Sequence, residues 1–121
     1  MKFDALEPIF ERTRYIHGRI GTPCNVQVAI EGPSDTRPFV DHFREMWRRC
    51  LSGFLKSASN GEVLPFAPEL LPYSVDIGGQ SHLIYYAQQT SVAGDMVEES
   101  DRWEQADFLF ELIERQASNL V

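Results

Sequence analysis

The feature that most constrains the fold is a run of apolar residues at helical spacing between residues 36 and 58. Eight apolar side chains fall at positions i, i+4, i+7, i+8, i+11, i+12, i+15 and i+16: Phe39, Phe43, Met46, Trp47, Cys50, Leu51, Phe54 and Leu55. This spacing places them on one broad face of an amphipathic helix. Because other elements must cover so wide an apolar face, the segment predicts a long helix inside a packed domain.

The ends of this helix also carry sequence signals. Ser34-Asp35-Thr36 supplies a candidate N-cap, whose side-chain oxygen can accept hydrogen bonds from the free amides of the first turn. Asn60-Gly61 is expected to close the helix, because both residue types tolerate the left-handed conformation of a C-terminal cap.

Two elements are predicted before this helix. Apolar residues at helical spacing predict a helix from about Asp4 or Glu7 to Arg19, ended by the glycines and proline of segment 18–23. In segment 24–30, CNVQVAI, the two valines and the isoleucine alternate with other residues. This period of two is typical of a half-buried strand.

A loop and a hairpin are predicted after the long helix. Segment 60–72 contains three prolines, which exclude a central strand and a regular helix, so we expect an ordered loop. Residues 74–77 and 81–89 read as two strands joined by the tight turn Gly78-Gly79.

The last predicted element is a helix from near Asp101 to about Asn119. Asp101 and Glu104 stand in the N-cap and N3 relationship of a capping box. An apolar stripe along the helix is expected to pack against the sheet. Its members are Trp103, Ala106, Phe110, Ile113 and Ala117, widened by Leu109 and Leu112.

Together these elements predict an α+β fold. We expect a small antiparallel or mixed sheet of about three strands packed against two long helices, with an additional N-terminal helix. The composition, 43% hydrophobic and 24% charged, is ordinary for a globular protein. Since no repeat or linker divides the chain, residues 1–121 are expected to form a single domain.

Charge is distributed unevenly along the chain, which has a net charge of −7. Residues 1–60 carry nine basic and seven acidic side chains, whereas residues 61–121 carry two basic and eleven acidic ones. This balance disfavours direct binding to nucleic acid or to anionic membranes. The N-terminus lacks a signal-peptide pattern and no stretch approaches the ~20 apolar residues of a membrane span, so a cytoplasmic protein is expected.

The cysteines and histidines show no metal-binding pattern. Cys24 and Cys50 are separated by a spacing typical of neither metal sites nor redox motifs, so we expect two buried thiols. His17, His42 and His82 lie on three different predicted elements, and no metal or cofactor is predicted. The sequence also contains no phosphate-binding glycine loop and no nucleophile elbow. These observations favour a protein that is not an enzyme, without excluding catalysis.

Acidic residues gather in the C-terminal region. Segment 95–114 holds eight acidic side chains and one basic side chain, Arg102. Within the last predicted helix, four of the acidic residues fall at i, i+3, i+7 and i+10 and form one continuous acidic ridge. The acidic ridge consists of Glu104, Asp107, Glu111 and Glu114.

An acidic ridge has the charge expected of a surface that meets a basic protein patch. We therefore expect the acidic ridge, with Asp101 at its start, to bind a protein partner. Two alternatives are simple solvation of the ridge and pairing with the arginines of the long helix, Arg44, Arg48 and Arg49.

The favoured function is a non-catalytic binding or inhibitor protein that masks a basic surface of a protein partner. In size, charge and lack of catalytic motifs the chain resembles immunity proteins, antitoxins and phage-encoded inhibitors, which implies the same mode of action. One alternative is a small-molecule or nucleotide-binding domain, with or without catalysis, whose pocket near the hairpin would use Tyr85, Tyr86, His82, Arg12, Arg14 and Arg19. Another is a structural subunit of a larger assembly, a homo-oligomer included.

Overall fold

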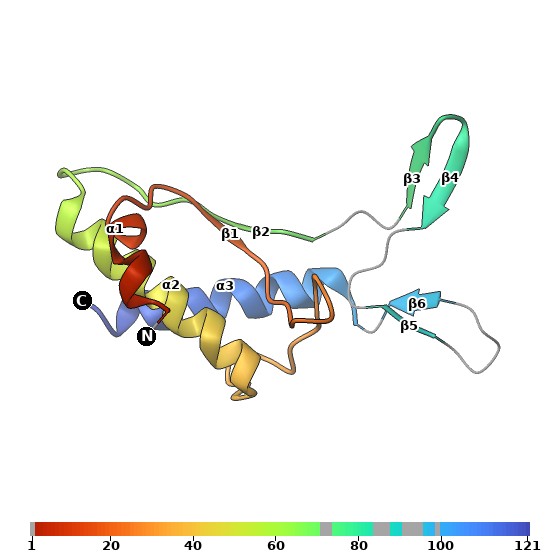
Figure 1. The fold of residues 1–121 in the computed structure, drawn as a ribbon, viewed down its shortest axis with the longest axis horizontal. Coiled ribbons are helices and arrows are strands. Elements are labelled where there is room, and N and C mark those ends of the chain that lie inside the picture. Colours follow the sequence, from red (N-terminus) through yellow and green to blue (C-terminus); the bar gives the residue numbers. More distant parts are fainter. Residues whose placement is uncertain (1, 71–73, 84–87, 91–95, 99) are drawn as a thin grey trace.

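A computed structural model shows two long helices packed against each other, α2 (Pro38–Ser57) and α3 (Arg102–Ser118). The structure describes residues 2–70, 74–83, 88–90, 96–98 and 100–121. The shorter elements are η1 (Asp4–Leu6), α1 (Glu7–Phe10), β1 (Ile16–Gly18), β2 (Phe66–Pro68), β3 (Ser74–Ile77), β4 (Gln80–Leu83), β5 (Gln88–Thr90) and β6 (Met96–Glu98) (Figure 1). The α+β class and both predicted long helices are confirmed.

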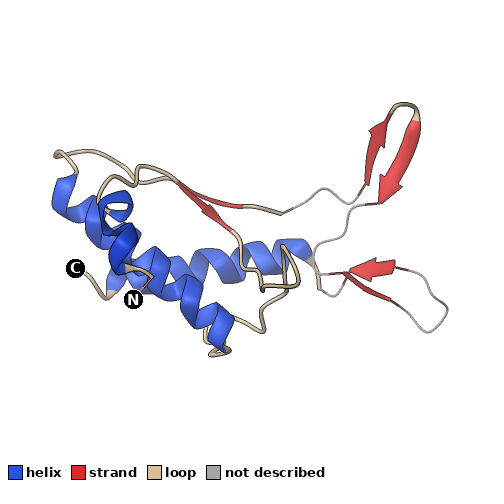
Figure 2. Cartoon of the chain, in the orientation of Figure 1, coloured by secondary structure: helices blue, strands red, loops and turns tan. Residues whose placement is uncertain are grey.

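The described strands form two-stranded sheets and not the single sheet of about three strands that we predicted. β1 pairs with β2 in parallel, whereas β3 with β4 and β5 with β6 pair antiparallel. The β1–β2 pair runs beside the long helices, and the other two pairs lie at the end of the molecule where α3 begins (Figure 2).

The hydrophobic core lies between α2, α3 and the β1–β2 pair. Trp47 of α2 is fully buried, and its ring meets the edge of Phe66 of β2 with the centroids 5.4 Å apart. Phe66 also contacts Phe110 of α3 at 5.4 Å, so one chain of aromatic contacts joins the three elements. The buried core residues are Ile16, Ile20, Ile30, Val40, Trp47, Leu109, Leu112 and Ile113.

The N-terminal helix is shorter than predicted. It ends at Phe10, and the Ile16–Gly18 part of the segment expected to be helical up to Arg19 is instead strand β1. The amide of Ile16 donates to the carbonyl of Pro65, 3.0 Å away, next to β2. Pairing with a strand that is distant in the sequence buries Ile16 and overrides the local helical pattern.

The strand predicted over 24–30 is wrong, because this segment is irregular. Val26 is 68% exposed and Gln27 is 6% exposed, the reverse of the expected alternation. The side-chain amide of Gln27 donates to the carbonyl of Glu69 at 2.8 Å. Individual bonds of this kind satisfy polar groups that a strand ladder would otherwise satisfy.

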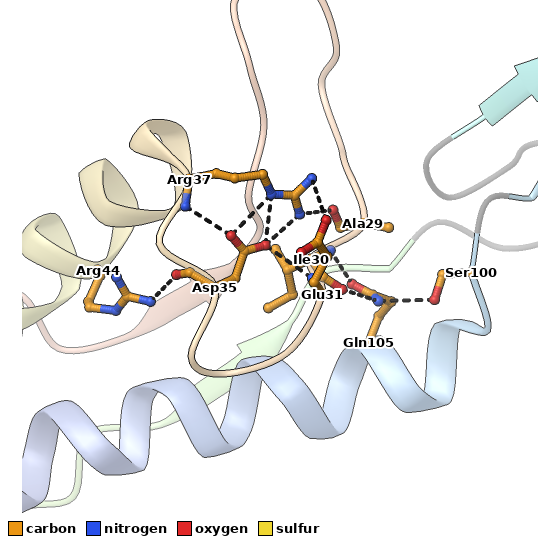
Figure 3. A network of polar contacts seen from close by, with 8 residues as sticks. All are labelled: Ala29, Ile30, Glu31, Asp35, Arg37, Arg44, Ser100 and Gln105. Carbon is orange, nitrogen blue, oxygen red and sulfur yellow. Dashed lines mark hydrogen bonds and ion pairs between the residues drawn. The ribbon is translucent and has the colours of Figure 1, made fainter.

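Gln105 of α3 holds the end of this segment. Its side chain is 1% exposed and bonds both backbone groups of Ile30: Oε1 accepts from the amide at 2.8 Å, and Nε2 donates to the carbonyl at 2.9 Å (Figure 3). Nε2 also donates to Oγ of Ser100 at 3.0 Å. The two bonds to Ile30 reproduce the exchange made by a hydrogen-bonded residue pair in antiparallel strands.

Asp35 organises the turn that leads into α2. Its carboxylate accepts from the amides of Glu31 and Arg37, at 3.0 and 2.9 Å, and from Nε of Arg37 at 2.9 Å (Figure 3). Arg44 donates to the carbonyl oxygen of Asp35. The Arg37 guanidinium, helped by the two amides, lowers the pKa of Asp35 to about 2, against the effect of burial.

The predicted capping of α2 is therefore wrong in detail, although the helix itself is confirmed. The N-cap residue is Arg37, which makes no side-chain capping bond. At the other end the helix stops at Ser57, and Ala58 is extended. Gly61, with φ of +87°, lies in the turn that follows the helix and not at its cap.

The loop expected over 60–72 contains β2, and residues 71–73 lie outside the described residues. The hairpin of β3 and β4 is confirmed, with Gly78 and Gly79 at φ of +61° and +80°, a conformation that favours glycine. Of the strand predicted over 81–89, the structure describes β4 as far as Leu83 and β5 from Gln88, and residues 84–87 lie outside the described residues.

The predicted start of α3 is confirmed. Oδ1 of Asp101 accepts from the amides of Trp103 and Glu104, at 2.9 and 3.0 Å, and so caps the helix. Among the helices in the described ranges, none is both long and apolar enough to traverse a bilayer.

The Gln105 bonds give the first testable prediction. Gln105→Leu leaves the buried amide and carbonyl of Ile30 unpaired, so we expect the free energy of unfolding to fall by about 2–4 kcal/mol in a urea titration followed by circular dichroism. Gln116→Leu, on the same helix, is the matched control and should change it by less than about 0.5 kcal/mol. Equal effects of the two substitutions would contradict this role for Gln105.

Asp35 gives a prediction about pH. Because folding lowers the pKa of Asp35 from 3.8 to about 2, its ionised form stabilises the fold above about pH 4, and this contribution disappears as the pH falls toward 2. Asp35→Asn should therefore lower the free energy of unfolding by about 2 kcal/mol at pH 7 and by progressively less toward pH 2. Urea titrations of both proteins at several pH values measure this difference, and a pH-independent difference would contradict it.

Candidate functional site

The solvent-facing side of α3 carries the acidic ridge. Helix α3 buries one side, which consists of Gln105, Ala106, Leu109, Leu112 and Ile113. All four ridge residues, Glu104, Asp107, Glu111 and Glu114, are exposed on the opposite side. The structure thus places them together on a regular helix, at the spacing that the sequence indicated.

Two aromatic residues border the acidic ridge. Trp103 is 77% exposed and Phe110, seven residues later, is 41% exposed. The prediction that Trp103 belongs to the buried stripe is wrong. Gln105 and Ala106 face the core, and this rotation of the helix turns Trp103 outward beside Asp107, and Phe110 beside Glu114.

Asp101 has a different role from that of the ridge residues. Its Oδ1 is engaged with two amides of the first helical turn. The residue thus fixes where α3 begins, and it stays exposed at the start of the acidic ridge.

Most of the acidic ridge forms no ion pair with the residues that the structure describes. Glu111 pairs with Arg115 at 2.6 Å, and Arg115 also donates to Oγ of Ser34 at 2.7 Å. Within the described part of the chain, no ion pair joins Glu104, Asp107 or Glu114 to a basic side chain.

The arginines of α2 pair elsewhere. Arg44 bonds Asp41, and Arg48 lies 2.6 Å from Glu45. Arg49 contacts Glu45 at 2.8 Å and the N-terminal acidic residues Asp4 and Glu7 at 3.4 and 3.1 Å. Among the described residues these arginines do not neutralise the acidic ridge.

The residues of the alternative pocket lie apart where the structure describes them. Arg14 donates to Oγ of Ser57 at 3.3 Å and lies over the ring of Phe54, beside the C-terminal end of α2, and Arg12 is exposed nearby in the chain. His82 is exposed on β4, at the opposite end of the molecule (Figure 1). Tyr85 and Tyr86 lie outside the described residues.

The histidines and cysteines form no metal site in the described ranges. His42 stacks on Phe3 with the ring centroids 4.8 Å apart, and His17 lies 3.8 Å from Glu69. The prediction of two buried thiols is wrong for Cys24, which is exposed, whereas Cys50 is partly buried. Burial raises the pKa of the Cys50 thiol.

Comparison of the chain with protein-family models, curated proteins and solved structures finds no significant match. Its function must therefore be inferred from its own residues. The spacing of the apolar residues does not locate the exposed aromatics, because it does not show that the polar Gln105 faces the core.

The two thiols give a prediction. Only the thiolate form attacks a disulfide reagent, and burial both shields Cys50 and disfavours its thiolate. With Ellman's reagent at pH 8 we expect one fast and one slow thiol in the native protein, about tenfold or more apart in rate. Cys24→Ser should remove the fast phase and Cys50→Ser the slow one. If both thiols react at the same rate, this difference in exposure is contradicted.

Proposed function

We propose that this protein is a non-catalytic binding protein, which covers a basic surface of a protein partner with the solvent side of α3 and thereby inhibits that partner. This would be the mode of action of an immunity protein or antitoxin. The observation that carries the proposal is the combination on one helix of the exposed Trp103 and Phe110 with three carboxylates that form no ion pair with any described residue.

The aromatic residues supply the apolar part of the proposed interface. Tryptophan is the residue most enriched among those that dominate binding energies, because it buries a large area and loses few rotatable bonds. The exposed Trp103 places a large apolar surface in contact with water, which is unfavourable. Burial against a partner would remove this contact. Phe110, already held on one side by Phe66, offers its other edge to the same partner.

The carboxylates determine the kind of partner. Residues 61–121 carry eleven acidic and only two basic side chains, so the field around α3 attracts a positive surface and repels phosphate backbones and anionic lipids. Complementary charge between two binding surfaces mainly raises the association rate and the specificity, and it contributes less to the affinity. A protein with a basic surface is therefore the proposed ligand.

The scaffold of the proposed site is rigid. Asp101 caps α3, and Gln105 ties the helix to Ile30 through two buried hydrogen bonds. The backbone of such a helix loses little further conformational entropy on binding, which favours it as a docking surface over a loop that must order.

Charge reversal on α3 tests the proposal. A partner is isolated from an extract of the native cell on the immobilised chain and purified, and its dissociation constant is measured by calorimetry at two salt concentrations. We expect Asp107→Lys/Glu114→Lys to weaken binding about tenfold or more, and more strongly at low salt. Trp103→Ala should weaken it by about 2 kcal/mol, or about thirtyfold.

The matched control changes the same amount of charge elsewhere. Glu11→Lys/Asp76→Lys reverses two exposed carboxylates outside α3, and binding should stay within about twofold of the native value. If both double variants weaken binding equally, the attraction is a property of net charge alone and the proposed α3 interface is wrong. Circular dichroism checks that each variant is folded.

A further inference from the structure

A cleft with a volume of about 840 Å³ lies between segment 17–26 and the first turns of α2. Small-molecule sites commonly have volumes of roughly 300–1,000 Å³. No residue of the acidic ridge lines the cleft. The cleft is therefore separate from the surface proposed to bind a protein partner, and a ligand bound there would add a second activity.

One wall of the cleft is aromatic. Phe39, His42 and Phe43 fall at i, i+3 and i+4 on α2 and so face the same side of the helix. The guanidinium of Arg37 lies 4.9 Å from the ring centroid of Phe39. Across the cleft, the exposed side chain of Val26 forms an apolar counterpart. This wall can take a flat ring.

The other end of the cleft presents charges of both signs. Nη1 of Arg19 contacts Oε1 of Glu69 at 3.1 Å. Two hydrogen bonds hold the backbone of Glu69 in place. Its amide donates to the carbonyl of Gly18 at 2.9 Å, and its carbonyl accepts from the side-chain amide of Gln27 at 2.8 Å. Arg19 and Glu69 directly follow β1 and β2, whose last residues Gly18 and Pro68 are paired, so both charged residues lie at the same end of the β1–β2 pair.

This ion pair keeps hydrogen-bonding capacity for a ligand. Within the described part of the chain, Nε and Nη2 of Arg19 make no hydrogen bond, and Oε2 of Glu69 lies 3.8 Å from Nδ1 of His17, beyond hydrogen-bond distance. A ligand carboxylate can bond Arg19 and a ligand ammonium can bond Glu69 while the pair stays intact.

The two charges also exclude other ligands. A phosphate dianion near Arg19 would be repelled by the adjacent Glu69, and a simple cation near Glu69 would be repelled by Arg19. A ligand that carries one charge of each sign next to an aromatic ring satisfies both residues at once.

We propose that the cleft binds a small aromatic zwitterion of the α-amino-acid class. Its ring lies against Phe39 and Phe43, its carboxylate bonds Arg19, and its ammonium group bonds Glu69.

A series of related ligands tests the proposal on the full chain. Calorimetry or ligand-detected NMR compares L-phenylalanine with 3-phenylpropionate, which lacks the ammonium group, phenethylamine, which lacks the carboxylate, and L-alanine, which lacks the ring. Because hydrogen bonds between charged groups are strong, loss of either charged group should weaken binding about tenfold or more, and loss of the ring, which removes the apolar contact with Phe39 and Phe43, should weaken it likewise. N-acetylphenylalaninamide, which has the ring and no charge, should bind about as weakly as the poorest of these.

Variants assign the two charges. In Arg19→Gln the preference for phenylalanine over phenethylamine should fall to about twofold, and in Glu69→Gln the preference over 3-phenylpropionate should fall likewise. Arg12→Gln, an exposed arginine outside the cleft, is the control and should change neither preference. Val26→Glu alters only an exposed side chain, so it tests the apolar wall even if a charge variant fails to fold, and it should weaken phenylalanine binding about tenfold.

Two outcomes would overturn the proposal. One is the absence of phenylalanine binding at millimolar concentration in a folded protein. The other is equal binding of phenylalanine and N-acetylphenylalaninamide, which would show that the charges of Arg19 and Glu69 do not select the ligand. Neither outcome bears on the α3 interface, because the two sites share no residue.

Discussion

A single buried side-chain amide, that of Gln105, fixes the position of α3 relative to the segment that precedes α2. It takes the place that a neighbouring strand would take beside Ile30, and a buried amide of this kind is stable only when its hydrogen bonds are made. Because Gln105 must point inward, the rotation of α3 about its axis is determined. The apolar residues Leu109 and Leu112 then enter the core, and the acidic ridge faces water. The core and the proposed docking surface thus depend on the same two bonds.

The parts of the fold that the sequence predicted correctly are those whose signal is local. The apolar spacing around Trp47, the glycine pair of the hairpin and the cap at Asp101 each act within a few residues, and all three appear in the structure. Strand β1 and the irregular segment 24–30 were predicted incorrectly because their partners are distant in the sequence. Ile16 pairs beside β2, and Gln27 bonds Glu69, so tertiary contacts overrode local patterns there.

The same contrast between local patterns and contacts of distant segments explains which parts of the candidate sites were predicted. The acidic ridge lies on one helix, so its spacing alone placed its members together. The exposure of Trp103 depends on which side of α3 enters the core, and a stripe that counted Trp103 as apolar gave the wrong side. The cleft could not be predicted, because Arg19, Phe39 and Glu69 come from three segments that only the folded chain brings together.

The bonds between Ile30 and Gln105 join residues 75 positions apart, and this separation affects how the protein is made. The ribosome releases the chain from its N-terminus, so α2 can form while α3 is still being synthesised. Until Gln105 emerges, the backbone groups of Ile30 lack their partner and the apolar face around Trp47 lacks the cover of α3. Closing so long a loop is entropically costly and slow. During that interval the nascent chain presents to chaperones an aromatic surface that the finished protein hides.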